Sequence, residues 1–129
     1  MGRGDRGIAG EGEGTGEDLF WDLAAALLAD PAVTRSTMMG LPCLRLRGRF
    51  FASVDRRTQA LLVKLPASRV TGLITGGHGE PFAPAGRVFR EWVALPRPDR
   101  RRWSALLYEA QEYATGPSPG GPADEPPAG

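Results

Sequence analysis

Residues 44–54, LRLRGRFFASV, decide the fold, because apolar side chains recur at every second position on both sides of a glycine. Leu44 and Leu46 alternate with arginines, and the pattern resumes after Gly48. A period of two is typical of a half-buried strand, and a glycine between two such runs indicates a hairpin. The stretch therefore predicts two antiparallel strands. The buried side chains of the second strand would be Phe50, Ala52 and Val54.

Similar patterns continue outward from this hairpin. Alternating apolar residues predict strands at 61–65 and 89–95, and β-branched residues favour another at 33–38. Helical spacing predicts helices at 15–29 and 66–75 and a last one after Pro98, with Trp103, Leu106, Leu107, Ala110 and Tyr113 on one stripe. Hairpin-linked strands with helices near the ends predict an α+β fold: one small domain, an antiparallel β-sheet and helices packed on one face.

The length of 129 residues fits one domain. The 18 glycines and 12 prolines concentrate near the two ends, where large apolar side chains are scarce. Such composition cannot bury enough apolar surface to offset chain entropy. We therefore expect disordered tails at 1–16 and 115–129 around a folded domain at 17–114.

Several classes of protein do not fit this composition. The longest apolar run, at 23–29, has seven residues, whereas a membrane-spanning helix needs about 20. No apolar segment follows the charged N-terminus, and the single cysteine, Cys43, permits no internal disulfide. One cysteine and one histidine cannot form a zinc cage. The sequence predicts a cytoplasmic protein without a metal or cofactor.

The charge is distributed unevenly although the net charge is only +1. Residues 34–102 contain fourteen basic and four acidic residues, net +10, whereas 1–33 and 103–129 carry −5 and −4. This asymmetry indicates an anionic partner for the middle segment, or acidic ends that fold back over it.

The alternation along the strands also predicts which side chains point away from the core. On the outer sheet face we expect Arg45, Arg47, Phe51, Ser53, Leu62, Lys64, Arg90 and Trp92. Basic side chains beside exposed rings resemble a platform for single-stranded nucleic acid. The favoured interpretation is instead that the first helix or a second subunit covers this apolar patch. Leu62 favours an interface, because an aliphatic side chain serves a protein partner better than a nucleic acid.

A second basic group begins the last predicted helix, where Arg100, Arg101 and Arg102 follow one another. Cations oppose the helix dipole there at about 0.3–1 kcal/mol each, a cost that a phosphate or an acidic partner would offset. The favoured interpretation is a solvated charge run that needs no partner. The candidate partner or nucleic-acid face consists of Arg45, Arg47, Phe51, Lys64, Arg90, Trp92, Arg100, Arg101 and Arg102.

Catalytic residues are not expected. His78 and Glu80 lie in a glycine-rich loop and could form an acid–base pair, but no nucleophile or orienting group stands at a matching spacing. A solvated loop histidine is the better interpretation. Cys43 stands beside Pro42 among apolar residues, which favours a buried packing role over a nucleophile.

Short motifs along the chain resemble those of a known family. They are Met38-Met39-Gly40, Gly48-Arg49-Phe50-Phe51-Ala52, Val63-Lys64-Leu65, Pro81-Phe82 and Glu91-Trp92-Val93 before a closing amphipathic helix. Over roughly 18–114 the chain resembles the N-terminal domain of the TfoX/Sxy family and the related MmcQ/YjbR-like proteins. The resemblance implies a small α+β domain with an antiparallel sheet, no cofactor, no catalytic residue and a regulatory or binding role. Some YjbR-like members are labelled DNA-binding.

The sequence thus predicts a non-enzymatic regulatory or binding module that acts through protein–protein contacts, with a protein partner or as a homodimer. The alternative is a direct DNA- or RNA-binding protein that uses the basic sheet face. A third interpretation is a small enzyme that uses His78 and Glu80.

Overall fold

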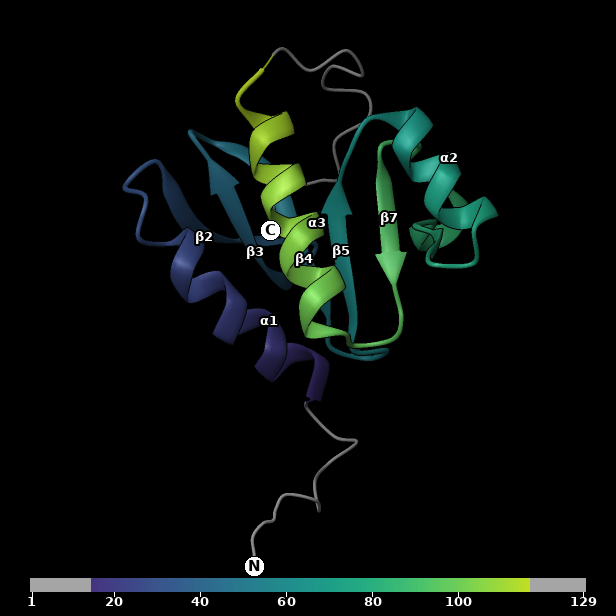
Figure 1. Ribbon diagram of the computed structural model, residues 1–129, viewed down its shortest axis with the longest axis horizontal. Coiled ribbons are helices and arrows are strands. Elements are labelled where there is room, and N and C mark those ends of the chain that lie inside the picture. Colours follow the sequence, from purple (N-terminus) through teal and green to yellow (C-terminus); the bar gives the residue numbers. More distant parts are fainter. Residues whose placement is uncertain (1–14, 117–129) are drawn as a thin grey trace, which may run out of the picture.

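The computed structural model describes residues 15–116, which form one six-stranded sheet with three α-helices (Figure 1). In chain order the elements are α1 (Thr15–Leu27), β2 (Val33–Met38), β3 (Leu41–Leu46), β4 (Arg49–Asp55), β5 (Ala60–Lys64), α2 (Ala67–Thr75), β6 (Glu80–Pro81), the 3-10 helix η1 (Pro84–Gly86), β7 (Trp92–Leu95) and α3 (Arg100–Ala114). The strand order is β2-β3-β4-β5-β7-β6, and all neighbours are antiparallel. The predicted α+β class is confirmed.

Two tight hairpins build the first half of the sheet. Met39 and Gly40 join β2 to β3 with φ of +54° and +78°, and Arg47 and Gly48 join β3 to β4 with φ of +50° and +87°. Two successive positive φ values define the two-residue turn whose twist matches that of the flanking strands. The hairpin predicted from 44–54 is therefore confirmed, and so is the strand at 33–38.

The main core lies between the sheet and the helices. α1 and α3 cross the same face of the sheet, over β4 and β5, while α2 packs beside β7 (Figure 1). The stripe predicted on α3 is confirmed from Trp103 to Ala110, and these side chains are at most 2% exposed. One row of the sheet faces them, namely Leu44, Ala52, Val63 and Val93.

A smaller apolar cluster covers part of the opposite face. Its buried members are Met38, Cys43, Phe50, Leu62, Phe82, Phe89 and Trp92. The segment between β6 and β7 supplies Phe82 and Phe89, whose ring centroids are 5.8 Å apart, and Phe82 lies 6.2 Å from the Trp92 ring. A loop of the same chain therefore covers this part of the face, for which the sequence offered the first helix, a second subunit or a nucleic acid as the cover.

A β-bulge reverses the predicted placement of two phenylalanines. Leu44 pairs with Ala52 and Arg45 pairs with Phe50, so Phe51 is an extra residue in β4. An extra residue changes which side chains share a face. Phe51 joins the helix-side core and Phe50 the opposite cluster, whereas the alternation predicts the reverse.

Other boundaries differ less. The predicted strand 89–95 begins only at Trp92, and the two-residue strand β6 was not predicted. The predicted tails 1–16 and 115–129 lie outside the described residues, except for Thr15 and Gly16, which belong to α1, and Thr115 and Gly116, which directly follow α3.

Candidate functional site

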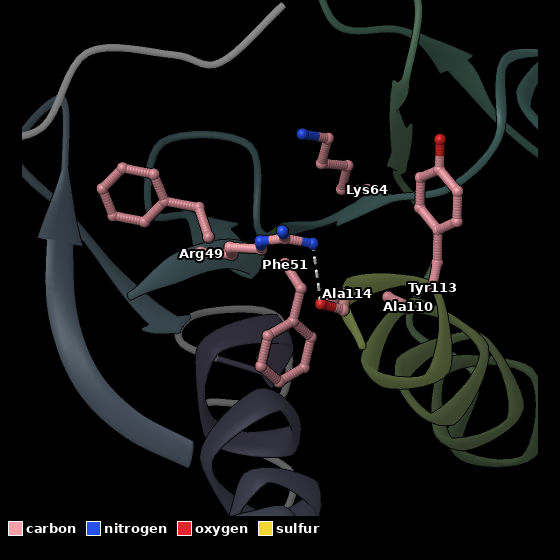
Figure 2. A pocket seen from close by; sticks show the side chains of 7 residues that line it. Arg49, Phe51, Lys64, Ala110, Tyr113 and Ala114 are labelled. Atoms are coloured by element: carbon pink, nitrogen blue, oxygen red, sulfur yellow. Dashed lines mark hydrogen bonds between the residues drawn. The ribbon is translucent and has the colours of Figure 1, made fainter. Parts of the chain in front are cut away.

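The structure separates the predicted basic face into two groups at opposite ends of the sheet. Because the strands are antiparallel, the start of β4, the end of β5 and the start of β7 meet at one end, where the Leu65 N–H donates to the Glu91 carbonyl at 2.8 Å. Arg47, Lys64 and Arg90 lie there. α3 ends there too, since Arg49 Nη1 donates to the Ala114 carbonyl at 3.3 Å (Figure 2).

Arg100, Arg101 and Arg102 begin α3, which has 15 residues and therefore spans about 22 Å. Figure 1 shows that α3 begins at the other end of the sheet, so these three arginines lie there. A single basic surface that includes all the predicted cations is therefore wrong.

The predicted aromatic platform is also wrong. Phe51 and Trp92 are both 0% exposed, and Leu62 is 1% exposed. The Phe51 ring lies beside α1 on the helix side (Figure 2), and Trp92 lies beneath Phe82. A base cannot stack on either ring, because other parts of the same chain cover both.

Lys64 is not a surface cation but part of a buried polar cluster. Its Nζ lies 3.9 Å from Glu91 Oε1, and the Tyr113 hydroxyl donates to Glu91 Oε2 at 3.1 Å. The Lys64 and Glu91 side chains are only 6% and 9% exposed. Sequence reasoning missed Glu91 and Tyr113. No local pattern indicated them, because the pairing of Lys64 with Trp92, which brings Glu91 near the lysine, joins strands that are far apart in the sequence.

A small pocket lies next to this cluster (Figure 2). Its walls are Arg49, Phe50, Phe51, Lys64, Ala110, Tyr113 and Ala114. The cavity volume of about 10 Å³ is close to what one water molecule needs. The pocket beside the buried pair therefore has room for about one water molecule between α3 and the sheet.

The arginines at this end have different environments. The Arg45 guanidinium lies over the Phe50 ring, 4.3 Å from its centroid, and is half-buried. Arg49 also donates to the Gly116 carbonyl, and a cation at the C-terminal end of a helix is favoured by the dipole. Arg47, in the hairpin turn, and Arg90, before β7, are exposed.

At the other end, part of the helix-dipole cost is offset within the chain. Asp99 caps α3 by accepting from the Arg102 N–H at 3.0 Å, and Arg100 pairs with Asp22 of α1 at 2.5 Å. The side chains of Arg101 and Arg102 are exposed beside a depression of about 360 Å³ between α2 and α3.

The remaining candidates behave as isolated groups. His78 and Glu80 are both exposed, and within residues 15–116 no hydrogen bond or ion pair joins their side chains. Cys43 is 0% exposed, which confirms the predicted burial, and this burial raises the pKa of its thiol to about 11. Over the same described range, no group of three or more His, Cys, Asp or Glu could hold a metal, and no helix is long and apolar enough to span a bilayer.

The two edges of the sheet are unequal. β6, at one edge, has two residues, one of which is the proline Pro81. β2, at the other, has six residues and contains no proline. Proline, charge and short length are the usual protections of a sheet edge, so β2 is the less protected of the two.

One contact shows the hydrogen-bonding parity of β2, that is, which residues direct their backbone N–H and C=O groups toward β3 and which direct them outward. The Arg47 N–H donates to the Ala32 carbonyl at 2.9 Å, so Ala32 and every second residue after it direct their backbone groups toward β3. The backbone N–H and C=O groups of Arg35 and Thr37 therefore point outward, and both residues are exposed.

Comparison of the chain with protein-family models, with curated proteins and with solved structures found no match.

Proposed function

We propose that this chain is a non-enzymatic binding module that acts through protein–protein contacts, and that β2 is its contact element. The observation that supports the proposal is the open edge: Arg35 and Thr37 present backbone donors and acceptors to solvent along a six-residue strand. Addition of an extended segment to such an edge is a common mode of protein recognition. The resemblance to TfoX/Sxy N-terminal domains favours the same regulatory or binding class.

The side chains at this edge leave the backbone accessible. The Arg35 guanidinium folds over the Trp21 ring of α1, 4.8 Å from its centroid, on the helix side of the sheet. Thr34 and Thr37 are short and exposed. An incoming strand would therefore meet main-chain groups without first displacing a charged side chain from the edge.

A strand-addition experiment tests this proposal without a known partner. The probe is a synthetic peptide of residues 31–40, added in excess while backbone amide exchange is followed by NMR. We expect slower exchange at the outward amides of Arg35 and Thr37 and little change at Ser36, which faces β3. Thr37→Pro removes an outward N–H and should abolish the effect, whereas Thr37→Ala, which keeps it, should not. Unchanged exchange at both outward amides would overturn the proposal.

The alternative function, direct DNA or RNA binding, has its own supporting observation. Arg47, Arg90, Arg101 and Arg102 are exposed and make no ion pair within the part of the chain that the structure describes. These cations could contact phosphates, although no stacking face accompanies them.

A salt titration separates this alternative from the first proposal. Each phosphate contact that a charge reversal removes should reduce the log–log salt slope of nucleic-acid binding by about 0.7–0.9. Because the two basic groups lie at opposite ends of the sheet, Arg47→Glu with Arg90→Glu should act separately from Arg101→Glu with Arg102→Glu. Salt-independent binding, or none, would exclude a phosphate-driven interaction.

A further inference from the structure

We infer that the partner of β2 is β2 of a second copy, paired antiparallel around a two-fold axis at Ser36 with Arg35 opposite Thr37 of the other copy. This inference rests on the proposed function, since it names what the open edge binds. It would join two six-stranded sheets into one continuous sheet.

Backbone parity restricts the registers that such a pair can adopt. Only Arg35, Thr37 and the carbonyl of Val33 direct hydrogen-bonding groups outward, because the Val33 N–H donates to the Asp30 carbonyl at 2.9 Å. Hydrogen-bonded partners in an antiparallel pair must both present outward groups. Outward residues can therefore face only outward residues. Axes at Arg35, at Ser36 or at Thr37 keep at least one pair in which both residues have an outward N–H and an outward C=O, whereas axes at Val33 or Thr34 keep none.

Side-chain chemistry selects among these three axes. An axis at Arg35 places two guanidinium side chains directly opposite each other, and like charges in that position are destabilising. An axis at Thr37 retains one hydrogen-bonded pair within the strand, because Arg35 would then face the turn residue Met39. An axis at Ser36 retains two hydrogen-bonded pairs, both of Arg35 with Thr37, and places no like charges directly opposite each other.

The faces of the two sheets also match in this register. Arg35 and Thr37 both lie on the helix side, since Arg35 packs on Trp21 of α1 and Thr37 is two residues away. Ser36 lies on the opposite face, beside Cys43. Residues opposite each other in an antiparallel pair share a face, so the helix layers of both copies would continue on one side of the joined sheet. Trp21, which is partly exposed in one copy, lies next to the new contact.

Disulfide trapping tests the axis directly. Residues opposite each other in a pair that is not hydrogen-bonded have Cα atoms about 4.5 Å apart, within the range that a disulfide spans. Ser36→Cys should therefore cross-link two copies under mild oxidation. The variant needs a Cys43→Ala background, because Cys43 is the neighbour of Ser36 on β3. Thr34→Cys in the same background is the matched control, because it lies on the same face and would oppose Met38 rather than itself.

Light scattering of the unmodified chain provides a second measurement that does not depend on the cysteine variants. The apparent mass should double as the concentration rises, and Thr37→Pro should hold it at one copy. Cross-linking at Arg35→Cys in place of Ser36→Cys would overturn the register, and one copy at every concentration up to about 1 mM would overturn the dimer. In that case slower exchange with the 31–40 peptide would leave the proposed function standing, whereas unchanged exchange would remove both.

Discussion

Gly16 lies where α1 begins to pack on the turn between β4 and β5, and replacing it with alanine should destabilise the protein. A Cβ atom at this position would lie 2.1 Å from the carbonyl oxygen of Gln59 and 2.8 Å from its carbonyl carbon. Both atoms belong to the backbone of a turn in which Gln59 has φ of +65°. Neither can rotate away, so α1 and the turn must separate.

The expected loss of unfolding free energy follows from the contacts that are disturbed when α1 separates from the turn. Overpacking of this kind costs about 1–3 kcal/mol. The Glu17 N–H donates to Gln59 Oε1 at 2.8 Å, and loss of that bond adds about 0.5–1.5 kcal/mol. The ion pair of Arg56 with Glu17 adds little, because the Arg56 side chain is 58% exposed. Alanine stabilises a helix by about 0.5–1 kcal/mol relative to glycine, which offsets part of this loss. The net loss is about 0.5–4 kcal/mol, with a central value of about 2 kcal/mol.

Urea and thermal unfolding of Gly16→Ala measure this loss, with Gly72→Ala as the matched control. Gly72 lies within α2, and a Cβ there would meet nothing within 4 Å, so this change should stabilise the protein by about 0.5–1 kcal/mol. At about 4–8 °C per kcal/mol, a loss of about 2 kcal/mol in Gly16→Ala should lower Tm by about 8–16 °C. A Gly16→Ala protein as stable as Gly72→Ala would refute the close contact between α1 and the turn.

Three further changes probe the interior. Lys64→Met leaves the Glu91 carboxylate buried without its cation and should lower the free energy of unfolding by about 3 kcal/mol. The double variant Lys64→Met with Glu91→Gln should lose less than the sum of the two single variants. Additive losses would contradict the pairing. Trp103→Ala should lower the free energy of unfolding in urea by about 3–5 kcal/mol. Tyr108→Ala, at an exposed position of the same helix, should lower it by less than about 0.5 kcal/mol. Equal losses would place Trp103 outside the core. Because burial raises the pKa of the Cys43 thiol to about 11, unfolded chains lose that proton first, and stability should fall between about pH 9 and 11. The fall should be smaller in Cys43→Ala, and equal falls would contradict the shift.

The sequence predicted the elements well where local chemistry determines them. The two-residue turns at Met39-Gly40 and Arg47-Gly48 need backbone conformations that glycine adopts readily, and they fix three strands. The stripe on α3 has only one face to bury. These features depend on near neighbours in the chain, so periodicity and turn residues were sufficient.

The candidate site was predicted less well, because its geometry depends on non-local contacts. The bulge in β4 is visible only in the pairing of β3 with β4, and a single extra residue exchanged the faces of Phe50 and Phe51. The cover over Trp92 comes from Phe82, ten residues earlier in a segment with no periodic pattern. Alternation predicts that a side chain points away from the main core, but it does not predict that a second apolar cluster on the opposite face buries that side chain.

The same reasoning explains why the parity of β2 is firmer than that of β4. Its pairing with β3 runs from Val33–Leu46 to Met38–Leu41 without an irregularity, and a two-residue turn closes it. A slip by one residue would turn Val33 and Met38 away from the cores that bury them at 4% and 0% exposure. Two separate apolar clusters therefore hold the strand at its two ends. The outward position of Arg35 and Thr37 is a consequence of that anchoring, and the edge that they form is as well determined as the cores behind it.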